Sequence, residues 1–427
     1  MKKLLVILIC EIIPLTTNAL ELPTNIVLHL DKYYPNYLET LQPWNSYPAT
    51  KQANLSTLTY VIGVFRHGNK PPTDTYEGDK YPYYDEKYWP NGYSQLTEVG
   101  KRQLQSLGKI LRMRYNGFLS ETYKSEEILV KVNHVDRVYM SATCLLAGLY
   151  PPFGKDLSQE QSQSEWQLVP VWEQHDMSKI AKDPIVCPRF YKMELEAEEI
   201  INKYTYQYQD LLDFLNNCTG MGVTKLRDVF KYWNLVYFRE QEGYPRPLWA
   251  SNGVMKVLTN LASSTFTALL STNKEMSKLI AGPLIKELAI ELRRKISGRA
   301  SDISRRKMHL EGGHGTSLNG LLPALGFKEP FVPHVGSVFL MELHRFHEGN
   351  YIQALYISNS STGDVELLEI PECGYECPLD QMLKRMDEVT PSNWATECEV
   401  SRGRCIGCIS NANILYVIAF ICVPILL

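Results

Sequence analysis

Strand-like and helix-like segments alternate near both ends of this chain, and this alternation constrains its fold more than any other feature. The apolar run Leu58–Phe65 is typical of a buried strand, and Thr97–Tyr115 has the apolar spacing of an amphipathic helix. A short strand at Ile128–Val132 precedes a helix that begins at Asp136. The alternation predicts an α/β fold with a mixed, mostly parallel sheet flanked by helices.

The middle of the chain has a different pattern. Met193–Asn216, Leu226–Phe238 and Asn252–Leu270 are helical patterns with no strand between them. Alternation returns near Lys307–Leu310, so we predict a mostly helical cap inserted into one α/β domain. The predicted boundaries are a signal peptide at 1–19, an N-terminal extension at 20–56, the first segment of the α/β domain at 57–159, the helical cap at 160–295, the second segment of the α/β domain at 296–398, and a spacer with a hydrophobic tail at 399–427.

The two ends of the chain indicate export. Lys2 and Lys3 precede the apolar run Leu4–Cys10, which predicts a signal peptide, with a buried N-terminal helix as the alternative. The apolar tail Ile414–Leu427 reaches only about 21 Å as a helix, which is shorter than a bilayer core of about 30 Å. A GPI-anchor signal fits this tail, with a short tail anchor as the alternative. Contact with a membrane is expected only through this segment.

Cysteines and glycosylation sequons agree with the secretory pathway, and we expect an extracellular, cell-surface or lysosomal protein. Outside the two end segments the cysteines are even in number; they are Cys144, Cys187, Cys218, Cys373, Cys377, Cys398, Cys405 and Cys408. Asn54, Asn217 and Asn359 begin Asn-x-Ser/Thr sequons and are predicted glycosylation sites. The net charge of −3, without a basic block, argues against nucleic acid as a partner.

Two histidine-bearing loops follow predicted strands. In the first, Arg66 and Lys70 flank His67, and cations beside a histidine can hold a phosphate while the imidazole attacks it. In the second, Gly312 and Gly313 precede His314, and Thr316 is the predicted cap of the next helix. Ligands of open α/β folds bind at the carboxyl ends of strands, so the loops are expected to meet. The alternative is a turn with a structural histidine.

These segments resemble the histidine acid phosphatases, the family branch that includes lysosomal and prostatic enzymes. The resemblance covers about residues 57–398 and rests on ordered motifs. They are Arg66-His67-Gly68-x-x-x-Pro72, Gly92-Tyr93-x-Gln95-Leu96-Thr97-x-x-Gly100, Asp136-Arg137-x-x-Met140-Ser141-Ala142, Leu149-Tyr150-Pro151-Pro152, Cys187-Pro188-Arg189-Phe190, Leu248-Trp249-Ala250, Cys373-x-x-x-Cys377-Pro378 and Trp394-x-Thr396-Glu397-Cys398. The resemblance implies a phosphoglycerate mutase-like fold.

The resemblance also implies a two-step reaction without metal or other cofactor. His67 attacks phosphorus and becomes phosphohistidine, while Arg66, two further arginines and His314 hold the phosphate oxygens. An aspartate directly after the second histidine protonates the leaving oxygen, and water then hydrolyses the phosphohistidine. The family further implies the disulfides Cys187–Cys398 and Cys373–Cys377, and often a homodimer.

This chain departs from the family pattern at the phosphate site. We place the second and third clamp arginines at Lys70 and Lys131, which replaces a planar guanidinium with a point charge. The family's proton-donating aspartate falls at Gly315, which has no side chain. Candidate substitute acids in the sequence are Glu311, Asp74 and Glu77.

Two hypotheses follow from these departures. The first is a phosphomonoester hydrolase that acts through His67 on a small molecule or phosphopeptide, with activity that is reduced or selective for good leaving groups. The second is an inactive pseudophosphatase that acts as a secreted or surface binding protein. Both predict that Arg66, His67, Lys70, Lys131 and His314 converge on one pocket.

Overall fold

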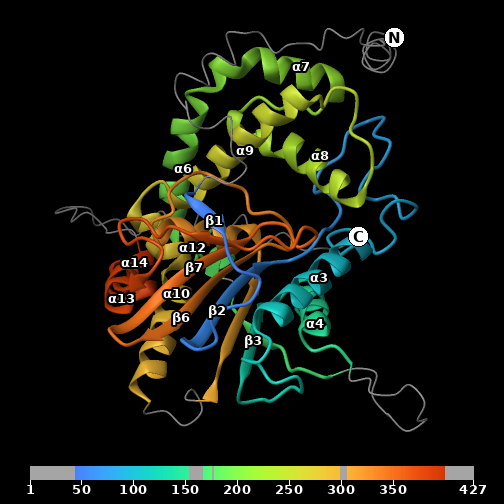
Figure 1. The fold of residues 1–427 in the computed structure, drawn as a ribbon. Coiled ribbons are helices and arrows are strands. Elements are labelled where there is room, and N and C mark those ends of the chain that lie inside the picture. Colours follow the sequence, from blue (N-terminus) through green and yellow to red (C-terminus); the bar gives the residue numbers. More distant parts are fainter. Residues whose placement is uncertain (1–43, 153–166, 176, 299–304, 400–427) are drawn as a thin grey trace, which may run out of the picture.

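The computed structural model describes residues 44–152, 167–175, 177–298 and 305–399 (Figure 1). The predicted signal peptide, the C-terminal tail and the pair Cys405 and Cys408 lie outside the described residues. Within the described ranges, no helix combines the length and the apolar character needed to cross a bilayer.

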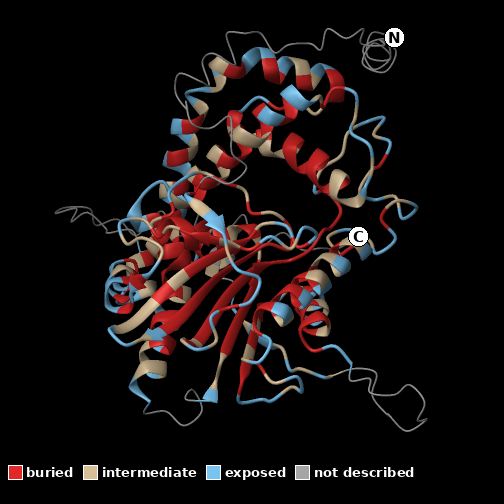
Figure 2. Cartoon of the chain, viewed as in Figure 1, coloured by how far each residue is buried: buried red, intermediate tan, exposed pale blue. Residues whose placement is uncertain are grey.

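A single mixed sheet forms the centre of the molecule, as the alternation of strands and helices predicted. Its strand order is β1-β8-β7-β6-β2-β5-β3-β4, and β9 pairs with β7. The strands are β1 (Ser46–Pro48), β2 (Leu58–Arg66), β3 (Ile128–Asn133), β4 (Trp172–Gln174), β5 (Met308–Gly313), β6 (Val338–Phe346), β7 (Gly349–Ile357), β8 (Glu366–Leu368) and β9 (Cys377–Pro378). Figure 2 shows that the central strands are buried along most of their length.

The expectation of a mostly parallel sheet was wrong. Only β2 with β5, β5 with β3 and β3 with β4 run parallel, whereas the pairings from β2 through β6, β7 and β8 to β1 are antiparallel. The difference arises because β6 and β7 follow each other through a tight turn, which allows only antiparallel pairing. Parallel strands require the longer helical crossovers found earlier in the chain.

Helices cover both faces of the sheet. On one face α3 (Glu98–Arg114) and α4 (Asp136–Leu149) pack over Val61, Phe65 and Leu310. On the other face α10 (Lys274–Ser297), α12 (Gly315–Ala324) and α13 (Leu379–Glu388) pack over Ile62 and Val64. Because both faces are covered, β2 is apolar almost throughout rather than alternating, which is the pattern predicted for a buried strand.

A group of helices between β4 and β5 surrounds an apolar core of its own, and Figure 1 shows it at one end of the sheet. It comprises α6 (Pro188–Asn202), α7 (Gln209–Thr219), α8 (Phe230–Glu242) and α9 (Asn252–Ser271). The single helix predicted over Met193–Asn216 is broken by a 3₁₀ turn at Thr205–Tyr208. The break falls in a Tyr- and Thr-rich stretch of low helix propensity, where burial of Tyr208 outweighs continuation of the helix.

Part of the predicted N-terminal extension and the last residues of the predicted second α/β segment also join the fold. Within the predicted N-terminal extension, Trp44 packs edge-on against Phe331 with ring centroids 4.8 Å apart, and β1 pairs with β8. Near the C-terminus, α14 (Trp394–Cys398) is tied to the start of α6 by the disulfide Cys187–Cys398, and Cys373–Cys377 forms the second disulfide. Both pairings implied by the family resemblance are confirmed.

Candidate active site

His67 lies immediately beyond the carboxyl end of β2, and backbone hydrogen bonds from two sides hold its loop. The His67 N–H donates to Gly313 O (3.1 Å), and the Gly336 N–H donates to His67 O (3.0 Å). The next residue, Gly68, packs against the first turn of α3, where an added Cβ would lie 2.4 Å from Gly100 O. Only glycine permits this close approach, which explains the Gly after the histidine.

The imidazole of His67 is held in the form that can attack phosphorus. Its Nδ1 lies 2.8 Å from Gly68 O, which can only accept, so the proton of the neutral ring is on Nδ1 and Nε2 carries the lone pair. The side chain is 3% exposed. Burial, followed by the charges of His314, Arg137 and Arg66, holds the pKa of His67 well below its usual value, so the ring stays neutral.

Four further side chains surround His67. The ring of His314 lies 5.3 Å from that of His67. Arg137, on the first turn of α4, directs Nη2 at Nδ1 of His314 (3.4 Å) and donates from Nη1 to Ser94 Oγ (2.8 Å). Arg66 and Lys70 also belong to the group. The charges of Arg66 and Arg137 are close enough to Lys70 to lower its pKa.

The cation of Lys70 and that of Arg66 lie beneath one aromatic ring of the helical group. Phe238, on α8, has Lys70 Nζ 4.3 Å and Arg66 Cζ 5.7 Å from its ring centroid. Lys70 Nζ also donates to Pro71 O (2.8 Å), and Arg66 donates to Pro333 O. Burial and the two arginine charges lower the pKa of Lys70 to about 7. Arg66 Nε is buried without a hydrogen-bond partner among the described residues, which leaves this donor available to bind an anion.

The structure does not bring Lys131 to this group. Side chains alternate along β3, so Val130 and Val132 face α3 and α4 while Lys131 faces α10, where it forms an ion pair with Glu287. Arg137 stands beside His314 instead. The sequence identified Arg137 only as a member of a motif, yet its position just beyond the end of β3 was the signal, because that is where ligands bind in such sheets.

The second histidine loop differs from its prediction in detail. His314 itself is the N-cap of α12, with its backbone N–H donating to Ser317 Oγ (3.2 Å), whereas Thr316 was the predicted cap. Gly315 is the first residue of the helix. A Cβ there would lie 3.4 Å from both Nε and Cζ of Arg66, which is ordinary van der Waals contact. The position therefore lies beside Arg66 and has room for a Cβ.

Among the candidate substitute acids, Asp74 interacts with this group through its charge, which raises the pKa of Lys70. Glu311 points to the opposite side of β5 and contacts His309. Asp74 accepts from Thr73 Oγ (2.8 Å), and Glu77 is exposed. His334 lies closer to the site, but burial and the Arg66 charge lower its pKa to about 4. Above that pH it is a neutral hydrogen-bond donor rather than an acid.

A buried neutral histidine beside several cations, at the carboxyl end of a central strand, is an arrangement that can bind a phosphate group and attack its phosphorus. Known proteins agree. The sequence pattern of the histidine phosphatase superfamily (branch 2) matches residues 57–356. Human prostatic acid phosphatase is 31% identical over 358 residues, covering 80% of this chain and 88% of that protein. Bovine lysosomal acid phosphatase is 31% identical over 357 residues, covering 81% of each.

Solved structures agree on the fold. A phytase from Hafnia alvei in complex with myo-inositol hexakis sulphate has a TM-score of 0.61 at 16% identity, covering 81% of this chain and 98% of that one. The phytase from Citrobacter braakii has a TM-score of 0.58 at 17% identity, covering 81% and 100%. The chain belongs to the histidine phosphatase superfamily, in its second branch, and its relatives are acid phosphatases, which are phosphoric monoester hydrolases.

Proposed function

We propose that this chain hydrolyses phosphomonoesters through a phosphohistidine on Nε2 of His67, and that it is selective for good leaving groups. The observation that carries the proposal is the state of His67, which is neutral and has its Nδ1 bound to Gly68 O. Arg66 and Arg137 hold the phosphate oxygens together with Lys70 and His314. As the new N–P bond forms, the bond from phosphorus to the ester oxygen breaks, and the electron pair leaves with that oxygen.

The proposed selectivity for good leaving groups follows from the absence of an acidic side chain at Gly315. No side chain at this position can protonate the departing oxygen, and such a proton donor typically contributes about 10²–10⁴ in rate. A phenolate departs without a proton, whereas an alkoxide does not. Water then attacks the phosphohistidine, releases inorganic phosphate and returns the lone pair to Nε2. Hydrolysis of matched aryl and alkyl phosphates tests this, with a kcat ratio of about 10² or more expected in favour of the aryl ester.

A second function is favoured by one specific observation. Phe238 covers the cations of Arg66 and Lys70, whose side chains are 6% and 8% exposed. Covered cations are compatible with a pseudophosphatase, because a protein that only binds a partner does not need a phosphate site that is open to solvent. Absence of turnover on aryl phosphates, in a protein with normal folding, would assign the chain to this binding class.

Within the proposed reaction, Arg137 rather than Lys131 holds the phosphate. We expect Arg137→Ala to lower kcat/KM for an aryl phosphate by about 10²–10³, which is typical for loss of one preorganised donor. The matched variant Lys131→Ala is expected to change kcat/KM by less than about threefold, because its partner is Glu287 on the other face of the sheet. Steady-state kinetics of the two variants decide between them, and a larger loss in Lys131→Ala would contradict this assignment.

Lys70 introduces a pH dependence that an arginine would not have. Since its pKa is about 7, Lys70 is an ammonium below that pH and a neutral amine above it. We expect the affinity for sulfate, whose own charge is constant, to fall about tenfold between about pH 6 and pH 8. Lys70→Arg is expected to remove this component of the dependence, and competitive inhibition by sulfate measures both proteins. An equal pH dependence in Lys70→Arg would show that another group is responsible.

We also propose that the protein works in the secretory pathway or outside the cell. Two disulfides support an oxidising compartment. The side chains of Asn54, Asn217 and Asn359 are exposed, as glycosylation requires. Attachment through the C-terminal segment belongs to this proposal, and release of the protein from cells by a GPI-specific phospholipase tests it.

A further inference from the structure

The segment Pro333–Ser337, which leads into β6, is bonded to both Arg66 and His67. Its first residue accepts a hydrogen bond from Nη1 of Arg66, and its last residue accepts one from the Arg66 backbone N–H (2.9 Å). Gly336, in the same segment, donates its N–H to His67 O (3.0 Å). The segment therefore forms one wall of the candidate phosphate site, and His334 is its second residue.

Tyr237, on α8, determines which nitrogen of His334 carries the hydrogen. The Tyr237 hydroxyl oxygen accepts from the Val335 N–H (3.0 Å), so the hydroxyl hydrogen is available for another partner. That partner is Nδ1 of His334, 3.2 Å away. Burial and the Arg66 charge lower the pKa of His334 to about 4, so the ring is neutral above that pH. A neutral imidazole whose Nδ1 accepts carries its hydrogen on Nε2.

The Nε2 edge of His334 is the edge that is open to a ligand. Its neighbours in the segment, Pro333 and Val335, are buried, whereas the His334 side chain is half-buried. Tyr237 is 6% exposed and covers the Nδ1 edge of the ring. Tyr237 is also the one hydrogen-bond partner of this imidazole among the described residues. An N–H donor is therefore left over on the opposite edge.

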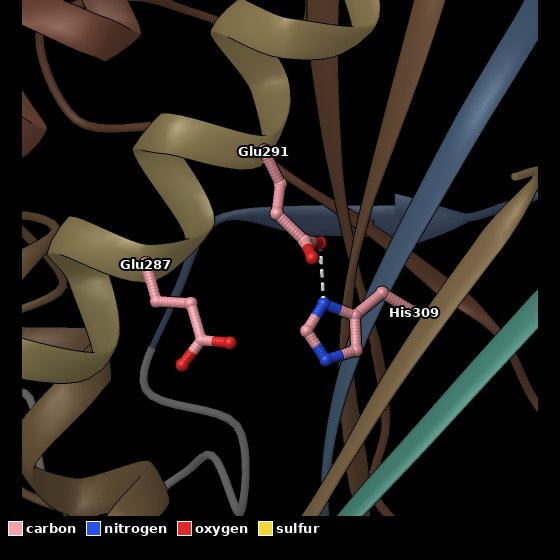
Figure 3. A group of neighbouring side chains, drawn as sticks. All are labelled: Glu287, Glu291 and His309. Atoms are coloured by element: carbon pink, nitrogen blue, oxygen red, sulfur yellow. Dashed lines mark hydrogen bonds and ion pairs between the residues drawn. The ribbon is translucent and has the colours of Figure 1, made fainter. Parts of the chain in front are cut away.

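His309, on the α10 face of the sheet, shows the contrasting arrangement (Figure 3). Its Nδ1 lies 2.5 Å from Glu291 Oε2, and its Nε2 lies 2.6 Å from Glu311 Oε1. Both ring nitrogens are paired with carboxylates, and the side chain is 0% exposed. His309 therefore serves the interior of the fold, whereas His334 retains one donor for a molecule that enters the site.

The guanidinium of Arg66 connects His334 with the position of the missing acid. A Cβ at Gly315 would lie 3.4 Å from Arg66 Cζ, and the same guanidinium donates to the carbonyl directly before His334. The charge of Arg66 also acts on the imidazole, since it contributes to the lowered pKa of His334. An anion that Arg66 binds is thus expected next to the His334 ring.

We propose that His334 donates a hydrogen bond from Nε2 to an oxygen of the bound phosphate group, and that Tyr237 is the positioning residue that keeps the hydrogen on Nε2. The inference rests on the proposed phosphate site. A donor next to an anion makes a stronger hydrogen bond than one between neutral groups. The neutral ring binds the phosphate without giving up its proton, so the proposed selectivity for good leaving groups is unchanged.

Equilibrium binding of sulfate to the purified chain at about pH 6 tests the proposal without turnover. At that pH Lys70 is charged and His334 is neutral. We expect His334→Asn to lower the affinity for sulfate at least about tenfold, which is typical for loss of a hydrogen bond to a charged group. His334→Gln, whose amide N–H can occupy the place of Nε2, is expected to stay within about threefold of the parent. His347→Asn, at an exposed histidine between β6 and β7, is the matched control and is expected to equal the parent.

The ¹⁵N spectrum of the histidine rings reports the position of the hydrogen directly. We expect the His334 hydrogen on Nε2 in the parent, a mixture of both tautomers in Tyr237→Phe, and a shift of the Nε2 signal when sulfate binds. The proposal is overturned if the hydrogen is on Nδ1, if His334→Asn binds sulfate as tightly as His347→Asn, or if His334→Gln loses as much affinity as His334→Asn. In these cases sulfate binding by the parent leaves the proposed phosphate site standing, whereas a parent that binds no sulfate overturns both.

Discussion

We expect His67→Ala to lower the kcat for an aryl phosphate by at least about 10³-fold, because removing a nucleophile removes the whole covalent route. The ring it deletes is buried beside Arg66, Arg137 and His314, so no other described side chain occupies the same place. Water could reach the vacated space, but it does not replace the imidazole nucleophile. In the parent, the hydrogen bond from Nδ1 to Gly68 O leaves the lone pair of the ring on Nε2. Single-turnover and steady-state hydrolysis measure the effect.

The control for His67→Ala is its rescue with added imidazole. The free base can enter the space that the side chain left, attack phosphorus and carry the phosphoryl group away as phosphoimidazole. Partial return of turnover would show that the rest of the site is intact. Undiminished turnover in His67→Ala without imidazole would contradict the phosphohistidine route, and would require a different nucleophile.

The second large effect is a gain. We expect Gly315→Asp to raise the kcat for an alkyl phosphate by about 10²–10⁴, and to raise that for an aryl phosphate much less. A Cβ at position 315 meets ordinary contact distances to the side chains of Arg66 (3.4 Å) and Phe266 (3.7 Å), so the first atom of a side chain fits without displacing backbone. An acidic residue in the first turn of α12 is also favourable for the helix.

Gly315→Asn is the matched control for this gain. It has the size of aspartate but cannot give up a proton as an acid, so it is expected to leave the alkyl rate near that of the parent. Equal gains in the two variants would mean that packing at Gly315 limits the rate. If Gly315→Asp hydrolyses aryl phosphates as the parent does but shows no gain for alkyl phosphates, the new carboxyl group does not reach the departing oxygen.

Local patterns in the sequence were sufficient for much of the fold. The strand before Arg66, the helix capped by Thr97 and the helix from Asp136 to Leu149 all occur where periodicity predicted them. Each is specified by neighbours within one turn or one strand, namely apolar spacing, a capping side chain or a following proline. The family motifs added the two disulfides, which spacing alone does not determine.

Other features depend on contacts that sequence distance conceals. Phe238 covers Lys70 only because α8 packs on the loop that follows β2, and this burial, with two arginines nearby, moves the pKa of Lys70 to about 7. The strand β1 forms because β8 offers it an edge. The pairing of Glu291 with His309 likewise arises where α10 packs against β5.

The sequence by itself determined the class of fold, the proposed nucleophile His67 and the absence of an acid at Gly315, because residue identity and local pattern suffice for each. The tertiary structure alone decided which cation joins the phosphate site. Lys131 and Arg137 lie close together in the sequence, so the motif spacing does not distinguish them. Side chains alternate across β3, however, and Lys131 faces α10. The turn into α4 then carries Arg137 to the carboxyl end of the sheet, beside His314.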